Sequence, residues 1–396
     1  MSRTGPGRGW LLRLVIAFAF AQGAVSMARP AVAYRALALG ADARAVGVIA
    51  GVYALLPLLA AVPLGRRTDH GRCAPLLPAG AALIALGCAG SGLAGSLPAM
   101  AAWSAVMGLG HLAFVIGAQS LVARQSAPGD HDRNFGHFTI GASLGQLVGP
   151  VAAGALIDTA APRSSALALL VSAAVCVCSY ATMWRIERPV AQPVRAEPAP
   201  RVPVIRILRT RGVPGGIYVS LAVLSAADVL TAYLPVVGEE RGIAPGVVGL
   251  LLSLRAGASI LCRIALARMV GLLGRDRLLA VSCLAAALLT AVLVARVPLW
   301  ALALALGLLG FCLGAGQPLS MTTVVQAAPA KARSTALALR LTGNRLGQIA
   351  APAGAGLLAG AAGTAAPFAM LGILLLTAAG TAARPPARSP APPGPT

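Results

Sequence analysis

Two ten-residue stretches decide how this 396-residue chain is read: GQLVGPVAAG (Gly145–Gly154) and GQIAAPAGAG (Gly347–Gly356). They lie 202 residues apart, and each belongs to an apolar run that is too long for a soluble core helix. The same offset relates Gly141 to Gly343. A register shared by distant sites indicates an internal duplication, which in membrane proteins builds two similar halves that meet along glycine-rich helices.

The composition places most of this chain in lipid. Hydrophobic residues make up 58% of the sequence and charged residues 11%, against about 25% charged residues in soluble domains. One crossing of the hydrocarbon core needs roughly 20 apolar residues. That window predicts twelve spans: 10–28, 44–64, 74–93, 98–121, 135–157, 165–184, 214–237, 246–268, 278–295, 298–322, 335–359 and 364–382.

These spans predict an all-α membrane protein, with twelve transmembrane helices in two pseudo-symmetric six-helix bundles. The expected domains are an N-terminal bundle (1–184), a basic Pro-rich linker (185–213), a C-terminal bundle (214–383) and a disordered tail (384–396). The linker is rich in arginine and proline, a composition that does not bury enough apolar surface to fold alone.

The positive charge is unevenly distributed between the two sides of the predicted membrane. With both termini in the cytoplasm, 22 of the 32 Lys and Arg residues fall in cytoplasmic segments. This bias follows the positive-inside rule, so we expect a multi-pass protein of the cytoplasmic membrane with both termini cytoplasmic, and no nucleic-acid partner. Only six basic residues fall in predicted external loops: Arg29, Arg35, Arg44, Arg163, Arg241 and Arg296.

Enzyme chemistry has little support in the predicted spans. They contain neither paired carboxylates nor histidines at metal-ligand spacing, and the seven cysteines form no CxxC pair. We therefore expect neither catalysis, nor a metal site, nor a cofactor.

Two motifs resemble the major facilitator superfamily, and the resemblance extends over essentially the whole chain. The sequence GRRTDHGR (65–72) is similar to the family's loop signature, with one residue fewer between Asp69 and Gly71. The span-five pattern Gly145-x-x-x-Gly149-Pro150-x-x-x-Gly154 resembles that of twelve-span drug/proton antiporters. The resemblance implies a secondary transporter that works by alternating access and exports a small organic molecule against protons.

The sequence departs from the antiporter pattern at two positions. The span-four arginine of many antiporters is replaced by Ser104, and the second copy of the loop has Gly271 where the acidic residue falls. A proton-coupled or facilitative uptake permease for a sugar or metabolite therefore remains an alternative, and a non-transporting membrane sensor is a second one.

The loop motif has two readings. Its residues are Gly65, Arg66, Asp69, Gly71 and Arg72. In the first reading Asp69 caps the cytoplasmic start of span eleven and acts as a gate. In the second it is a solvated topology signal.

The glycine motifs predict close helix contact. Glycines four residues apart share one helix face, and a proline bends the helix. We expect Gly145, Gly149, Pro150 and Gly154 to form a tight contact between the two halves, with Gly347 and Pro352 as the corresponding positions of the repeat.

Asp228 is the only acidic residue well inside a predicted span. A charge there is costly and needs a partner. Depth along the helices favours Arg255 as that partner, with Arg345 as a competitor. This charge network either exchanges partners and a proton during transport, or holds spans seven, eight and eleven together as a static pair.

Polar residues of the membrane region are candidates to line a substrate cavity: Gln22, Ser26, His111, Gln119 and Tyr233. His111 lies near mid-depth, where it either titrates during transport or is a satisfied structural histidine. Arg340 lies near the start of span eleven and is expected to reach the cytoplasm. The expected partners are a small-molecule substrate, protons and the lipid bilayer, and the expected functional unit is a monomer.

Overall fold

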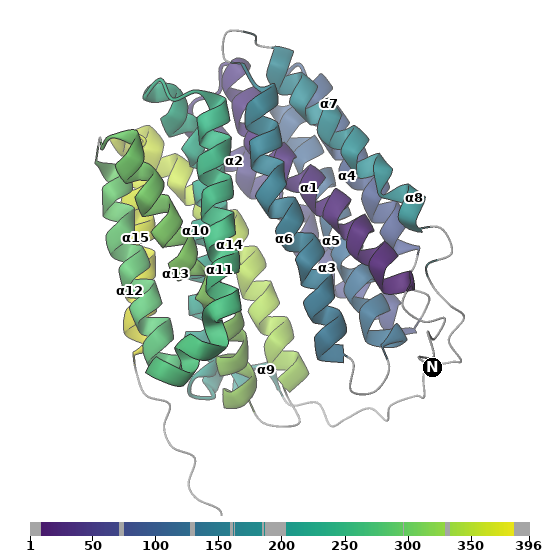
Figure 1. The fold of residues 1–396 in the computed structure, drawn as a ribbon, viewed down its shortest axis with the longest axis vertical. Coiled ribbons are helices and arrows are strands. Elements are labelled where there is room, and N and C mark those ends of the chain that lie inside the picture. Colours follow the sequence, from purple (N-terminus) through teal and green to yellow (C-terminus); the bar gives the residue numbers. More distant parts are fainter. Residues whose placement is uncertain are drawn as a thin grey trace, which may run out of the picture.

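The computed structural model describes residues 9–70, 75–126, 131–158, 161, 163–183, 186, 203–295, 297–328 and 333–383. Over these residues the secondary structure is helical throughout, and no strand forms. The helices fall into two groups that lie side by side, one from each half of the chain (Figure 1).

The first group contains the helices of the N-terminal half. It consists of α1 (Gly9–Ala38), α2 (Ala43–Val52), α3 (Leu55–His70), α4 (Leu76–Leu93), α5 (Leu97–Gln125), α6 (His131–Leu156), α7 (Arg163–Cys178) and α8 (Tyr180–Met183).

The second group contains the helices of the C-terminal half, preceded by one short helix. It consists of α9 (Val204–Arg209), α10 (Val213–Glu240), α11 (Pro245–Leu273), α12 (Arg275–Val294), α13 (Leu299–Ala327), α14 (Arg333–Ala362) and α15 (Ala366–Ala382). We call the end of the bundles that carries α9 the linker end and the opposite end the far end; the far end is at the top of Figure 1.

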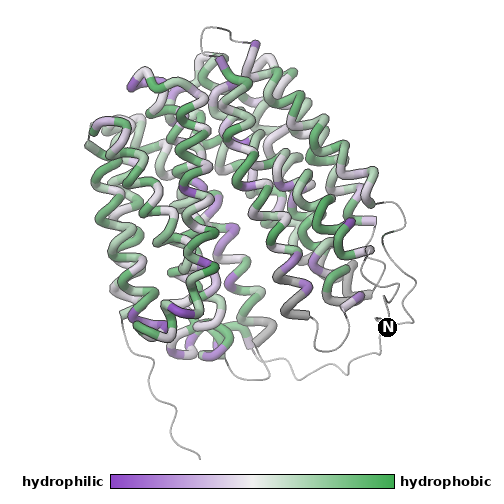
Figure 2. Tube along the Cα trace, viewed as in Figure 1, coloured by the Kyte–Doolittle hydropathy of each residue, from purple (hydrophilic) through white to green (hydrophobic). Residues whose placement is uncertain are grey.

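The hydropathy of these helices confirms the predicted fold class. Ten helical segments are long and apolar enough to cross a membrane, and α15 is a shorter apolar helix. The remaining long helix, α14, is less apolar because it carries three arginines. The tube in Figure 2 is mostly hydrophobic along the bundles, with hydrophilic stretches in the middle and at both ends. The chain is a multi-pass membrane protein.

Three boundaries differ from the predictions. Helix α1 continues to Ala38, so Arg29 lies inside it and not in an external loop. Predicted span two is interrupted at Tyr53 and Ala54, between α2 and α3. The linker contains α9, whose Ile207 is completely buried against the C-terminal half, because an apolar residue between arginines gives this short helix one face to pack. The predicted tail lies outside the described residues.

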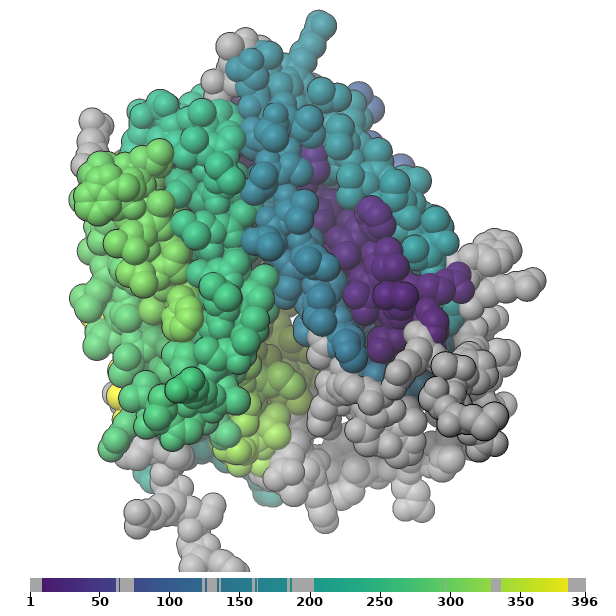
Figure 3. All heavy atoms as spheres, in the orientation of Figure 1, coloured from purple at the N-terminus to yellow at the C-terminus, as the bar shows by residue number. Residues whose placement is uncertain are grey.

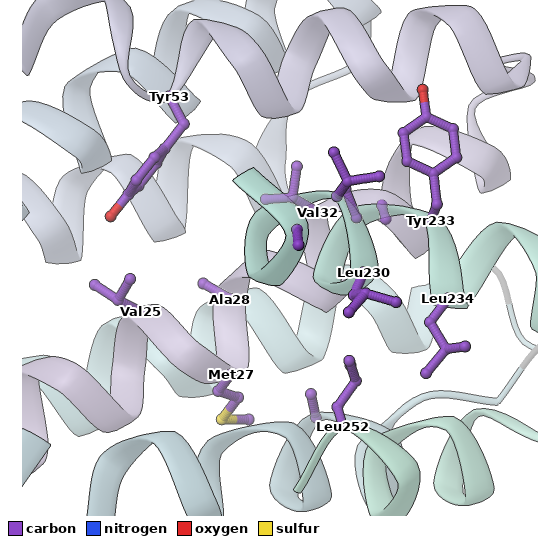
Figure 4. Packing of buried hydrophobic residues seen from close by; sticks show 14 of the residues in the cluster. Val25, Met27, Ala28, Val32, Tyr53, Leu230, Tyr233, Leu234 and Leu252 are labelled. Carbon is purple, nitrogen blue, oxygen red and sulfur yellow. The ribbon is translucent and has the colours of Figure 1, made fainter. Parts of the chain in front are cut away.

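One continuous cluster of buried hydrophobic side chains joins the two halves. Figure 4 shows Ala28 and Val32 of α1 together with Leu230 and Leu234 of α10 among the side chains of this cluster.

Candidate functional site

A cavity of about 230 Å³ lies between the two halves. Its walls come from α1, α5, α6, α10, α11, α13 and α14, and from the break between α2 and α3. In the space-filling view the surface is hollowed between α6 and α11, and α14 is visible at the back of the hollow (Figure 3). The polar lining residues are Gln22, Ser26, Arg29, Tyr53, His111, Gln146, Asp228, Thr231, Arg255, Ser259, Arg263, Gln317, Arg345 and Gln348.

An ion pair crosses the cavity from one half to the other. Arg29 Nη1 of α1 lies 2.6 Å from Asp228 Oδ1 of α10, and the Asp228 side chain is only 4% exposed. Asp228 is twelve residues from the far end of α10, or about 18 Å at 1.5 Å per residue. The predicted partner, Arg255, is therefore wrong as the direct partner of Asp228. Arg29 takes that position because α1 is longer than one membrane-spanning window.

Arg255 and Arg345 line the same cavity, as predicted from their depth, but without a carboxylate of their own. Within the described parts of the chain, neither has a carboxylate oxygen within 4.0 Å. Arg345 donates to Gln348 Oε1 at 2.7 Å, whereas Arg255 Nε is buried with no partner. An arginine in the middle of a span costs about 2.5–3.5 kcal/mol on insertion scales, so two uncompensated ones need a functional reason.

A hydrogen-bonded chain of side chains runs along the N-terminal wall. His111 Nε2 lies 3.1 Å from Gln22 Oε1, and Gln22 Nε2 donates to Ser26 Oγ at 3.2 Å. Tyr53 Oη lies 2.7 Å from His111 Nδ1. Since Gln22 Oε1 only accepts, a neutral His111 carries its proton on Nε2 and accepts from Tyr53. The Tyr53 ring also lies 5.3 Å from the guanidinium of Arg29, which joins this chain to the ion pair.

The structure corrects two of the five cavity candidates. Gln22, Ser26 and His111 line the cavity, whereas Gln119 and Tyr233 do not. Gln119 follows His111 by eight residues, which turns its side chain by about 80° and places it about 12 Å nearer the linker end. Tyr233 is completely buried, five residues and about 140° around α10 from Asp228.

The prediction that the Arg340 side chain extends to the cytoplasmic surface is wrong. Arg340 is 6% exposed and donates through Nη2 to both the carbonyl (3.0 Å) and the side-chain oxygen (2.6 Å) of Gln317. Gln317 donates to the carbonyl of Ser220, whose hydroxyl donates to Asn344. This network ties α10, α13 and α14 together. Sequence reasoning missed it, although four polar residues at similar depth were a visible signal.

The first two glycines of the span-five motif pack inside their own half. A Cβ added at Gly145 would lie 2.5 Å from the backbone nitrogen of Gly23 on α1, and one at Gly149 would lie 2.9 Å from its carbonyl oxygen. In the repeat, Gly347 packs against Leu221 of α10, also within one half. For Gly145, Gly149 and Gly347 the predicted contact between halves is wrong. Nine residues turn a helix by about 180°, so among the motif glycines Gly154 faces the other half, together with the carbonyl of Pro150.

The far end is closed by two contacts between the halves that repeat the 202-residue offset. In one, Gly249 of α11 meets the carbonyl of Pro150, and a Cβ at Gly154 would lie 2.5 Å from the Pro245 carbonyl. In the other, Gly47 of α2 meets the carbonyl of Pro352, and Gly356 meets the backbone of Arg44. We call these the α6–α11 contact and the α2–α14 contact.

Tyr233 distinguishes the second contact from the first. Its hydroxyl donates to the carbonyl of Ala43 at 2.9 Å and lies 3.4 Å from that of Pro352. The position 202 residues earlier is Ala31, which has no such group. The α2–α14 contact therefore has a polar bond that the α6–α11 contact lacks. Figure 4 shows the Tyr233 hydroxyl directed away from α10.

Most of the predicted gating loop lies outside the part of the chain that the structure describes. Gly71 and Arg72 lie outside the described residues, as do the side chains at Gly65, Arg66 and Asp69. The gating role of this loop stays a prediction. Among the residues that are described, no cluster of His, Cys, Asp and Glu has the composition of a metal site.

Comparison with known proteins agrees with this architecture. The family model of the Major Facilitator Superfamily matches residues 14–244 and again 217–396, so both halves resemble it. No curated protein matches the sequence.

Solved transporters share the fold at low sequence identity. They include a POT family transporter in complex with 5-aminolevulinic acid, with a TM-score of 0.78, 14% identity and 96% of each chain covered. The nucleoside transporter NupG gives 0.74 and 13%, over 94% of this chain and 98% of its own. A bacterial homologue of the human lysosomal transporter Spinster, inward-facing and occupied, gives 0.74 and 14%, over 96% and 97%. The chain belongs to the Major Facilitator Superfamily and is a membrane transporter of that type.

Proposed function

We propose that this transporter moves a small organic molecule across the cytoplasmic membrane by alternating access, coupled to protons through Asp228. The observation that carries the proposal is the ion pair between Arg29 and Asp228. Its two residues come from different halves and its carboxylate is buried, so a movement that separates the halves acts directly on it. The stability of a charge pair in this position depends on the transport state, so the pair can couple the movement of the halves to the charge of Asp228.

The positive-inside rule supports a cytoplasmic linker end. Once Arg29 is placed inside α1, five basic residues remain in the segments predicted to be external, against 22 in the segments assigned to the cytoplasm. Since the closest contacts between the halves gather at the far end, this conformation is the one that faces the cytoplasm. The opposite state requires the α6–α11 and α2–α14 contacts to open.

Proton coupling follows from the separation of the ion pair. If the halves rock apart at the far end, Arg29 on α1 and Asp228 on α10 move away from one another. An isolated carboxylate in the membrane is costly, so binding a proton from the outside stabilises it. Return to the cytoplasm-facing state restores Arg29 as the partner and releases the proton inward. If the substrate crosses on the opposite, outward step, this cycle uses the proton gradient for export, the direction that the span-five motif also favours.

The experiment is a proton-flux assay on the full-length protein in liposomes that contain a pH-sensitive dye. The compounds are small carboxylates, amines, neutral nucleosides and dipeptides. We expect that at least one compound, as it enters the liposomes, drives a saturable movement of protons out of them. Asp228→Asn should abolish proton movement while exchange of labelled compound continues.

The matched control is Asp276→Asn, because Asp276 is exposed on α12 and does not line the cavity. Normal proton coupling in Asp228→Asn would refute the assigned role of Asp228. Proton movement in the same direction as the compound would instead indicate uptake.

A further inference from the structure

We infer that the cavity binds a small organic anion with a carboxylate or phosphate group, held by Arg255 and Arg345. This inference rests on the proposed function, since it names the substrate class of the same cavity. It is narrower than the expectation of a small organic molecule, because it is carried by the charges that the fold places together.

The cavity has more positive than negative charge. Its described lining contains four arginines (Arg29, Arg255, Arg263 and Arg345) and one carboxylate, Asp228. Arg29 is already paired with Asp228 at 2.6 Å. Three arginines are therefore left facing the cavity without a described counter-ion. A cationic substrate would meet this excess charge and would have to displace Arg29 from the one carboxylate.

The free arginines have the chemistry of an oxyanion site. A guanidinium presents its donors in a planar fork that matches a carboxylate or a phosphate, and it does not lose its charge. Arg255 comes from α11 and Arg345 from α14, so an anion between them contacts two helices of the C-terminal half. Among the described residues neither guanidinium has a carboxylate oxygen within 4.0 Å, so their charges are not neutralised by an ion pair.

The rest of the wall suits a small and polar molecule. The volume of about 230 Å³ is below the roughly 300–1,000 Å³ of drug-sized pockets. Opposite the arginines, Gln22, His111 and Gln146 come from the N-terminal half. The side-chain amides of Gln22 and Gln146 bond hydroxyl, amide or carbonyl groups of a metabolite, whereas both ring nitrogens of His111 are already bonded to Gln22 and Tyr53. The N-terminal half therefore recognises the polar body of the substrate, and the C-terminal half its charge.

The test measures binding by the purified full-length protein in lipid nanodiscs, at constant ionic strength, through the thermal unfolding midpoint. The probes are succinate and glycerol 3-phosphate, with the neutral succinamide and the dication 1,4-diaminobutane as size-matched controls. We expect one or both oxyanions to raise the midpoint in a saturable way, while both controls leave it unchanged. Comparison of the two oxyanions shows whether carboxylate or phosphate is preferred.

Arg255→Gln and Arg345→Gln should each weaken oxyanion binding by about ten- to hundredfold, since each removes a charged hydrogen-bond donor. The matched control is Arg277→Gln, an exposed arginine of α12 outside the cavity, which should bind as the wild type does. If a glutamine variant does not fold, Arg255→Lys keeps the charge, loses the planar fork and should bind with intermediate affinity.

Three results would overturn the inference: no stabilisation by either oxyanion, stabilisation by the dication, or unchanged oxyanion binding in the double glutamine variant. The failure of the proposed function looks different. Oxyanion binding without any flux would refute the carrier and leave the inference standing. Saturable exchange of an amine or a neutral compound, with no oxyanion binding, would refute the inference and support the proposed transport function.

Discussion

A single methyl group at Gly47 should open the far end. An ideal Cβ built there meets the Pro352 carbonyl and the Tyr233 hydroxyl, and lies 2.9 Å from Gly356 Cα. All three separations are under 3.0 Å, which real Cβ atoms essentially never show. Two of these neighbours are backbone atoms of α14, so α2 and α14 must move apart. Gly47→Ala therefore destabilises the conformation in which the far end is closed.

The magnitude follows from the cost of overpacking. Insertion of a methyl group into a close contact costs about 1–3 kcal/mol. Because the clash exists only when the halves meet at the far end, the cost shifts the equilibrium between the two transport states. At about 1.4 kcal/mol per factor of ten, the population of the open far end rises about 5- to 150-fold.

The duplicated contact gives a second, independent test of the same reasoning. Gly249 is the partner of Gly47 at the 202-residue offset, and a Cβ there meets the Pro150 carbonyl and lies 3.2 Å from Gly154 Cα. Gly249→Ala should act in the same direction. The control is Gly380→Ala in α15, where a Cβ meets nothing within 4 Å. Any general effect of alanine on helix stability is shared by all three variants.

The measurement is the distance between spin labels at Ala38 and Ala362, the exposed last residues of α1 and α14 at the far end. It uses a background in which the seven cysteines are replaced. Pulsed electron resonance should show a longer distance gaining population in both far-end variants. The reasoning is refuted if neither variant changes the distribution, or if Gly380→Ala changes it equally.

Three further outcomes are expected. Tyr233→Phe removes the hydroxyl bonds of the α2–α14 contact and should raise the open population about fivefold, for a loss of about 1 kcal/mol, in the same spin-label assay. Asp228→Asn and Arg29→Gln should each lower stability to thermal unfolding by about 3–5 kcal/mol, and the double variant by less than the sum; strict additivity would contradict the ion pair. Gly145→Ala crowds Gly23 within one half, so it should lower the unfolding midpoint and leave the far-end distances unchanged.

The number and order of the membrane helices could be predicted because crossing a membrane depends on local composition. The end of α1 could not. A charge after about 20 apolar residues normally marks the end of a span, which places Arg29 in a loop when the sequence alone is considered. Arg29 stays inside the helix because Asp228, 199 residues away, neutralises it. No local window contains both residues.

The glycine motifs show a similar limit. Their spacing predicts that a backbone approaches closely, but not which helix supplies it. Gly145 contacts α1 in its own half, whereas Gly154, half a turn around the helix, contacts α11 in the other. The 202-residue offset contained more information, since it relates Gly47 to Gly249 and so connects the two far-end contacts. The two copies of the repeat keep the same glycine contacts between the halves, whereas the charged residues around the cavity differ between the copies.

The surplus positive charge of the cavity also makes the empty transporter sensitive to voltage. One elementary charge that crosses the whole membrane gains about 2.3 kcal/mol per 100 mV. As the halves rock, the three uncompensated arginines gain this energy in proportion to the share of the field that each of them crosses. An inside-negative potential then holds the unloaded protein facing the cytoplasm. A bound dianion cancels most of this bias, so the cell's resting potential resets the carrier after each release.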